Sequence, residues 1–173
     1  VVRTPAVSLD DISSIVATLD WDSPDNVSFG AELLTAFFLA LRTEDHVDGR
    51  MRWGDVYIQD DGSTDFLLPP GKSVRTYRHV AVAVRPDFLN LQRWLQRLAS
   101  FVPLARRASS CPVFVTFSKP DSGSYPAITR ADFTRRFKAK VTTVLGRSSQ
   151  LHAGYSLRRG GVTEMLSAGV PVV

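Results

Sequence analysis

The feature that most constrains the fold is a long apolar segment that ends at Arg42. Between residues 31 and 41 almost every side chain is hydrophobic, and Leu34 and Phe37 recur at helical spacing. A helix that is apolar on all sides must be surrounded by other elements. We therefore expect this helix, after a polar turn at residues 23–26, at the centre of one core. A chain of 173 residues with 44% hydrophobic content can bury a core of that kind.

The other segments predict a mainly helical α+β domain with a small antiparallel sheet. Amphipathic helices are predicted to begin at Ser8, at Pro86, at Thr129 and near Ser156. Short apolar runs separated by turn residues predict three strands, at 56–58, 66–68 and 77–84. The apolar run 113–117 fits either one more strand or an extended buried segment. On the last helix, the residues expected to face inward are Val162, Met165 and Leu166.

Membrane, disulfide and metal chemistry find no support in the sequence. No run of about 18 apolar residues and no charged-then-apolar leader occurs, which predicts a soluble intracellular protein without a membrane partner. It would be nuclear in a eukaryote and cytoplasmic otherwise. The single Cys111 cannot form an internal disulfide. Neither Cys111 nor His46, His79 or His152 has metal-ligand spacing, so we expect no metal and no small-molecule cofactor.

Positive charge is concentrated in the C-terminal third of the chain. The formal net charge is +4 and the isoelectric point is about 9.6, although the segment before Arg42 is acidic. Residues 130–164 carry many more arginines and lysines than carboxylates. This distribution predicts a basic face with phosphate as its natural partner. The residues expected to form that face are Arg130, Arg135, Arg136, Lys138, Lys140 and Arg159.

Arg42 requires an anionic partner if it lies where the apolar helix ends. Burying a guanidinium is costly unless an anion or a carboxylate receives it. Two kinds of partner remain open at this point. One is a structural ion pair with Glu44 or Asp45, and the other is a phosphate bound through two N–H groups.

The segment 154–161, which reads GYSLRRGG, also combines features of an anion site. It places Arg158 and Arg159 in the first turn of a helix, whose free N–H groups attract anions. The adjacent Gly160 and Gly161 would let another backbone or a DNA strand approach closely. The same residues also fit a glycine-containing helix start with a solvated Arg159.

In pattern and order, these segments resemble the catalytic domain of the tyrosine recombinases, or phage-type integrases. That family shows a helix ending in Leu-Arg, then an acidic residue and a Trp-x-Asp-Val step; residues 41–45 and 53–56 read LRTED and WGDV. It carries a lysine in the next hairpin, matched by Lys72. Its His-Ser-Leu-Arg-Arg-Gly-Gly-like box leading to Ala-Gly-Val-Pro is matched by residues 155–161 and 168–171.

The resemblance implies that duplex DNA is the partner and that copies of the chain can assemble on it. In the family a tyrosine attacks a phosphodiester, which gives a 3′-phosphotyrosyl link and a free 5′-hydroxyl. Arg42 and Arg158 would stabilise the charge on the phosphate oxygens without a metal. Lys72 would act as general acid for the leaving 5′-oxygen, and Tyr155 would position a phosphate oxygen. We therefore expect Arg42, Lys72 and Arg158 to converge on one concave electropositive spot.

Two departures from the family pattern bear on activity. Tyr155 stands where the family usually has histidine, and extra residues lie between Asp45 and Trp53. The chain also stops at Val173, before the position of the family's nucleophilic tyrosine. Residues 1–173 are therefore expected to be a single, C-terminally incomplete catalytic domain that is inactive as an isolated chain.

Three functions are compatible with these patterns. The first is part of a recombinase or integrase that acts in DNA recombination and integration, of the kind that mobile elements encode. The second is a non-catalytic DNA-binding relic of a mobile element. The third is a basic helical domain that binds RNA or an acidic protein, which would not need Arg42 or Lys72 close to Arg158.

Overall fold

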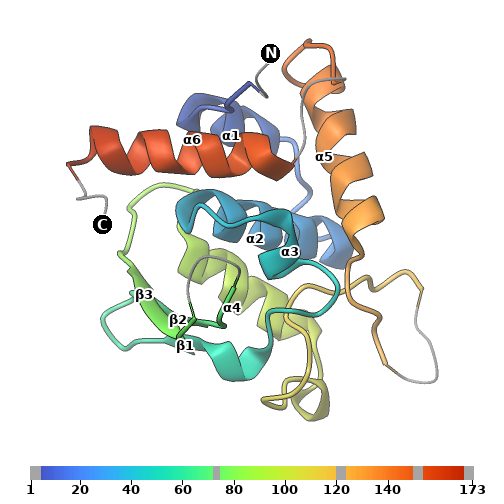
Figure 1. Ribbon diagram of the computed structural model, residues 1–173. Coiled ribbons are helices and arrows are strands. Elements are labelled where there is room, and N and C mark those ends of the chain that lie inside the picture. Colours follow the sequence, from blue (N-terminus) through green and yellow to red (C-terminus); the bar gives the residue numbers. More distant parts are fainter. Residues whose placement is uncertain (1–4, 72–74, 120–123, 150–153, 170–173) are drawn as a thin grey trace.

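Helix α2 (Pro24–Phe38) lies at the centre of the computed structural model, which describes residues 5–71, 75–119, 124–149 and 154–169. Every residue of α2 from Val27 to Phe37 is buried, which confirms the predicted central apolar helix. Helix α4 (Leu91–Phe101) and helix α6 (Gly154–Ser167) both pack against α2, and the sheet lies on the α4 side of the molecule (Figure 1).

The start of α2 corrects the prediction of a turn at residues 23–26. Ser23 is the N-cap, and its hydroxyl accepts a hydrogen bond from the Asn26 N–H at 3.4 Å. Pro24 stands in the first turn, where its missing N–H would have no partner inside the helix. The residues read as a turn are therefore a helix-start signal.

Helix α1 (Leu9–Val16) begins at Ser8, as predicted. The Ser8 hydroxyl accepts from the Asp11 N–H at 3.1 Å, and the Asp11 carboxylate accepts from the Ser8 N–H at 2.9 Å. Asp11 also receives two hydrogen bonds from the Arg147 guanidinium, at 2.8 and 2.9 Å. This bidentate pair joins α1 to the segment that follows α5.

Helix α5 (Arg130–Thr143) is capped by Thr129, whose hydroxyl accepts from the Asp132 N–H at 3.1 Å. As expected for an amphipathic helix, one face is buried, with Phe133, Phe137 and Val141. The sheet is also confirmed. It has the order β1-β2-β3, antiparallel throughout, with strands β1 (Val56–Ile58), β2 (Thr64–Leu68) and β3 (Arg78–Val82).

Helix α4 begins five residues later than predicted. Its N-cap is Asn90, whose side chain accepts from the Gln92 N–H at 3.1 Å, so Pro86 lies outside the helix. The segment between them is a turn, in which Asp87 accepts a hydrogen bond from the Leu89 N–H at 3.1 Å. A side chain with a strong cap geometry outcompetes proline as the start signal.

Residues 113–117 form an extended buried segment and belong to none of the described strands, which decides between the two predicted alternatives. Val113, Phe114 and Val115 are buried, and the segment makes one isolated bridge, between Val115 and Ala127. The Ser28 hydroxyl of α2 donates to the Val115 carbonyl at 2.7 Å and accepts from its N–H at 3.0 Å. The main chain of this segment also bonds to residues 126–128, through the Thr116 N–H to the Pro126 carbonyl at 2.8 Å and the Ile128 N–H to the Phe114 carbonyl at 3.0 Å.

The inner face of α6 differs from the prediction. Ser156, Leu157, Gly160 and Gly161 are buried, whereas Leu166 is 53% exposed and Val162 and Met165 are only partly covered. A Cβ at Gly160 would collide with the Val7 carbonyl oxygen, and one at Gly161 with the Phe37 carbonyl oxygen. The prediction placed the large apolar residues inward, but the glycines permit an approach that no side chain allows.

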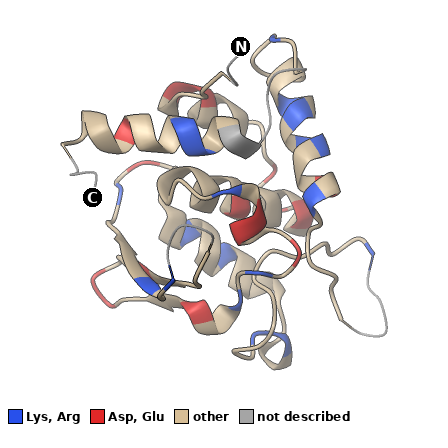
Figure 2. Cartoon of the chain, viewed as in Figure 1, with Lys and Arg blue, Asp and Glu red and all other residues tan. Residues whose placement is uncertain are grey.

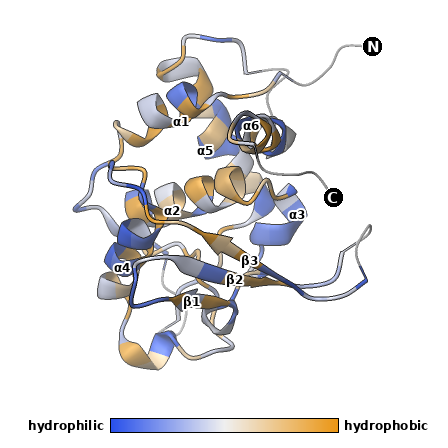
Figure 3. Cartoon of the chain, turned by 90° about the vertical axis from the view of Figure 1, so that its left-hand side faces the viewer, coloured by the Kyte–Doolittle hydropathy of each residue, from blue (hydrophilic) through white to orange (hydrophobic). Residues whose placement is uncertain are grey.

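Three short helices connect these elements, namely α3 (Thr43–His46) and the 3₁₀ helices at Trp53–Asp55 and Leu104–Arg106. Figure 3 shows α3 and α4 on opposite sides of the molecule. The architecture confirms a mainly helical α+β fold with a three-stranded antiparallel sheet. None of the described helices combines the length and the apolar composition that crossing a membrane requires.

The two buried glycines should be needed for stability. On an exposed helix Gly→Ala stabilises by up to about 1 kcal/mol, but here the added methyl meets backbone on both sides. We expect Gly160→Ala and Gly161→Ala each to lower the unfolding free energy by at least about 2 kcal/mol, measured by urea denaturation. Gly71→Ala is the control, because a Cβ there has open space. Stabilisation by either buried substitution would contradict the close approach.

Candidate phosphate-binding site

The candidate site is built where α2 turns into α3. At the end of α2, the Leu41 N–H donates to the Ala36 carbonyl at 2.9 Å and the Ala40 N–H to the Phe37 carbonyl at 3.1 Å. This pair of bonds is a Schellman motif, and Ala40 takes the left-handed conformation that it requires, with φ 49°. The turn reverses the chain and places Arg42 at its exit.

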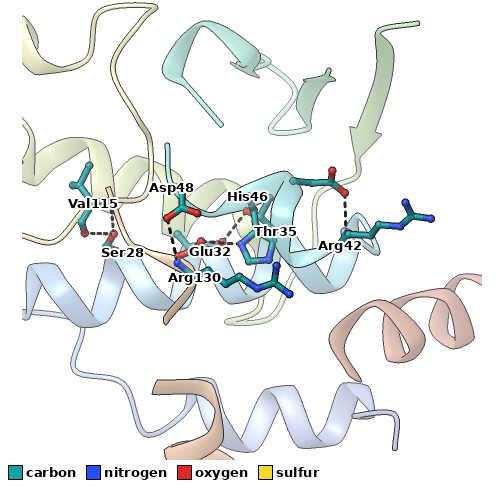
Figure 4. A network of polar contacts seen from close by, with 10 residues as sticks. Ser28, Glu32, Thr35, Arg42, His46, Asp48, Val115 and Arg130 are labelled. Atoms are coloured by element: carbon teal, nitrogen blue, oxygen red, sulfur yellow. Dashed lines mark hydrogen bonds and ion pairs between the residues drawn. The ribbon is translucent and has the colours of Figure 1, made fainter. Parts of the chain in front are cut away.

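Arg42 is the N-cap residue of α3. Its backbone N–H donates to the Asp45 carboxylate at 3.0 Å, so this carboxylate fixes the main chain at Arg42. The Arg42 residue is partly exposed, and its side chain extends away from the buried Glu32 and His46 (Figure 4). Of the two acidic partners considered, Asp45 therefore contacts Arg42 through the backbone amide.

Arg158 reaches the same turn from the other end of the chain. Its Nη1 donates to the Ala40 carbonyl oxygen at 3.3 Å, across 118 residues of sequence. The Gly161 backbone packs against Phe37 and Ala40 of the same turn, which explains how α6 comes close enough. The structure thus brings Arg42 and Arg158 to one junction between α2, α3 and α6.

Two other predicted members are Lys72 and Tyr155. Lys72 lies outside the described residues, and so does the side chain of Tyr155, although the α6 backbone at that position is described. His152 also lies outside them. In the part of the chain that the structure describes, no group of three or more His, Cys, Asp or Glu side chains is arranged to hold a metal ion.

The basic residues of α5 fall into two groups. Arginines and lysines are spread along this helix, as Figure 2 shows. The Arg135 side chain is 72% exposed and forms a 3.4 Å ion pair with Asp132. The Arg130 side chain belongs to an exposed residue, whose backbone N–H donates to Asp48 at 3.3 Å. Arg130 and Arg135 thus keep their side chains at the surface, and Lys138 and Arg159 are partly exposed.

Arg136 and Lys140 already make contacts within the fold. The Arg136 guanidinium lies 4.6 Å from the centre of the Phe29 ring and donates to the Asp25 carbonyl at 3.3 Å. Burial lowers the pKa of Arg136, against the opposing effect of Asp25. Lys140 Nζ donates to the Thr18 hydroxyl at 2.9 Å. A sequence pattern counts these cations with the surface ones, because it does not show where their ends lie.

Sequence reasoning missed a buried polar pair between α2 and α3. Glu32 of α2 is fully buried, and its Oε1 lies 2.8 Å from Nδ1 of His46, which is 2% exposed (Figure 4). Burial raises the pKa of Glu32 well above its usual range and lowers the pKa of His46 to about 3. Burial thus disfavours the charged form of both side chains. In the sequence, a single glutamate within an otherwise apolar helix could have indicated such a buried polar contact.

Comparison with solved structures shows where this fold occurs. No protein-family model matches the sequence, and no curated protein matches it. The XerH site-specific recombinase bound to its difH substrate is similar, with a TM-score of 0.66 and 13% identity over 96% of this chain and 45% of that chain. The FLP recombinase in a Holliday-junction complex is similar, with a TM-score of 0.58 and 10% identity over 93% of this chain and 40% of that one.

Both structural neighbours are tyrosine recombinases, and the fold expected from the sequence resemblance is confirmed at that level. The chain spans less than half the length of these neighbours. At such low identity, the likeness concerns the fold.

The pH dependence of stability follows from the pKa shifts of Glu32 and His46. Between about pH 3 and 6.5 the unfolded chain protonates His46 while the folded chain does not, so His46 makes stability rise with pH. Glu32 acts in the opposite sense, because the folded chain keeps a proton that the unfolded chain loses above about pH 4.5. Its contribution is present below pH 4.5 and is lost as pH rises through the raised pKa.

We expect Glu32→Gln to remove only the glutamate effect. The unfolding free energy of this variant, relative to the native sequence, should rise from about pH 4.5 upward by up to about 1.4 kcal/mol per pH unit. Urea denaturation at a series of pH values measures it. Ser28→Ala, which removes a buried polar group from the same helix without changing a titrating one, should shift stability equally at every pH. A pH-independent difference for Glu32→Gln would mean that Glu32 is ionised in the folded protein.

Proposed function

We propose that this chain is a duplex-DNA-binding domain built like the catalytic core of a tyrosine recombinase, in which Arg42 and Arg158 bind one backbone phosphate. The observation that carries the proposal is the 3.3 Å contact of Arg158 Nη1 with the Ala40 carbonyl, two residues before Arg42. Support comes from the fold, which is similar to that of solved XerH and FLP recombinase complexes with DNA.

The chemistry of the two arginines fits a phosphodiester. A guanidinium presents several N–H groups in one plane and can bind two phosphate oxygens at once. In strand cleavage, negative charge grows on the non-bridging oxygens while a tyrosine oxygen bonds to phosphorus and the bond to the 5′-oxygen breaks. Arg42 and Arg158 would stabilise that charge. Lys72 would give a proton to the departing 5′-oxygen, and Tyr155 would hydrogen-bond a phosphate oxygen.

The basic face of α5 and α6 would follow the DNA backbone beyond that phosphate. We assign the main contacts to Arg130, Arg135, Lys138 and Arg159. Arg136 and Lys140 belong to the same proposed face, but we expect smaller contributions from them, because Phe29, Asp25 and Thr18 already hold their cationic groups. Copies of the chain would assemble side by side on the same duplex.

DNA binding should fall steeply with salt, because each phosphate contact releases a condensed counterion. We expect a dissociation constant in the micromolar range at low salt, measured by fluorescence anisotropy on a labelled duplex. Arg42→Ala and Arg158→Ala should each weaken binding about tenfold and reduce the log–log salt slope by about 1.

The matched control is Arg93→Ala, which removes the same charge from the exposed face of α4. It should leave both the affinity and the slope unchanged. Equal effects of all three substitutions would mean that only net charge matters, and a flat salt response would remove the case for phosphate binding.

The tyrosines of this chain should not attack DNA. None of the four tyrosines, at positions 57, 77, 125 and 155, matches the family's nucleophile. We therefore expect no covalent adduct when the protein is incubated with a nicked suicide duplex and resolved by denaturing electrophoresis. An adduct that Tyr155→Phe abolishes would assign the nucleophile to that residue. The absence of histidine at this position favours the non-catalytic alternative, a DNA-binding relic of a mobile element.

A further inference from the structure

The starting observation is that Arg42 stands on an element too short to hold its own shape. Helix α3 has four residues, and an isolated helix of that length is not stable in water. Its orientation must therefore come from contacts with the rest of the protein. At its first turn the Arg42 N–H donates to Asp45, but this bond lies within α3 itself.

The most deeply buried residue of α3 is its last one, His46, which ties the helix to the core. The imidazole Nδ1 lies 2.8 Å from the Glu32 carboxyl of α2, and the ring meets Phe133 of α5 edge-on, with centres 4.8 Å apart. Both members of the polar pair are almost completely inaccessible to solvent. One side chain thus attaches α3 to two of the main helices.

The surroundings of the pair favour its uncharged form. Asp48, in the loop after α3, raises the pKa of Glu32 as burial does, and Arg136 of α5 opposes them. Burial alone lowers the pKa of His46. The second oxygen of Glu32, Oε2, is buried and has no hydrogen-bond partner in the described part of the protein, which suits a carboxyl group better than a carboxylate.

We propose that Glu32 and His46 are positioning residues. Their hydrogen bond orients α3 and thereby directs the Arg42 side chain toward the DNA phosphate. The inference rests on the function proposed above, and it assigns a role to two residues that do not touch DNA. A hydrophobic contact would bury the same area without fixing a direction, whereas a hydrogen bond restricts both distance and angle. The polar pair therefore sets the rotation of α3 about its own axis, on which the direction of Arg42 depends.

The test separates orientation from stability. Glu32→Gln keeps a neutral partner for His46 Nδ1 and should bind DNA within about twofold of the native protein. The double variant Glu32→Met with His46→Phe replaces the pair by apolar side chains of similar size. It should fold, because removing both hydrogen-bonding groups leaves no buried polar atom unpaired. We expect it to bind DNA about tenfold more weakly.

Arg42 identifies how that loss arises. In an Arg42→Ala background, the double variant should cause no further loss of DNA affinity, because the guanidinium that the pair would position is absent. Ser28→Ala serves as the matched control, since it removes two other buried hydrogen bonds of α2 and should lower stability while leaving DNA affinity unchanged. Equal losses with and without Arg42, or native affinity in the double variant, would overturn the proposal.

A second readout works without DNA. The Arg42 N–H is bonded to Asp45, so its hydrogen exchange reports whether the start of α3 stays in place. Exchange should be as slow in Glu32→Gln as in the native protein and at least about tenfold faster in the double variant. If Arg42→Ala does not affect DNA binding, the functional proposal fails. The exchange rate of the Arg42 N–H still tests whether Glu32 and His46 orient α3. An unchanged exchange rate of the Arg42 N–H in the double variant would be enough to rule out the positioning role.

Discussion

The structure depends on a backbone-to-backbone contact that two adjacent glycines make possible. Gly160 and Gly161 let α6 lie against the Val7 carbonyl on one side and the end of α2 on the other. Once α6 lies that close, Arg158 reaches the Ala40 carbonyl and therefore the turn that leads to Arg42. Leu157 is the one large apolar side chain that α6 buries fully among the described residues, so the helix is placed mainly by close approach.

The sequence predicted those parts of the fold that depend on local patterns. The apolar run of α2, the three short apolar runs of the sheet and the caps at Ser8 and Thr129 each act over a few residues, and all appear as expected. The start of α4 was misplaced because the Asn90 cap outweighed Pro86. Local competition of this kind involves side-chain geometry that the sequence alone does not show.

The candidate site was less predictable, because its contacts join distant segments. The motifs identified Arg42 and Arg158 as candidate site residues. The close backbone approach at Gly160 and Gly161, which brings them to one turn, is visible only in the structure. Glu32 and His46 are 14 residues apart and share no motif, so no local sequence pattern indicated their hydrogen bond. The same holds for Arg136, which was counted as a surface cation but lies against Phe29. Formal charge therefore overstates the cations available to a ligand.

The long span between Ala40 and Arg158 bears on the order of folding. Closing a loop of 118 residues carries a large entropy cost, so contacts of this kind form after local ones. During synthesis the N-terminal segments emerge first, and α2 and α4 can pack before α6 exists. The junction of the two arginines is thus completed last, which means that an immature chain carries the hydrophobic core without the site.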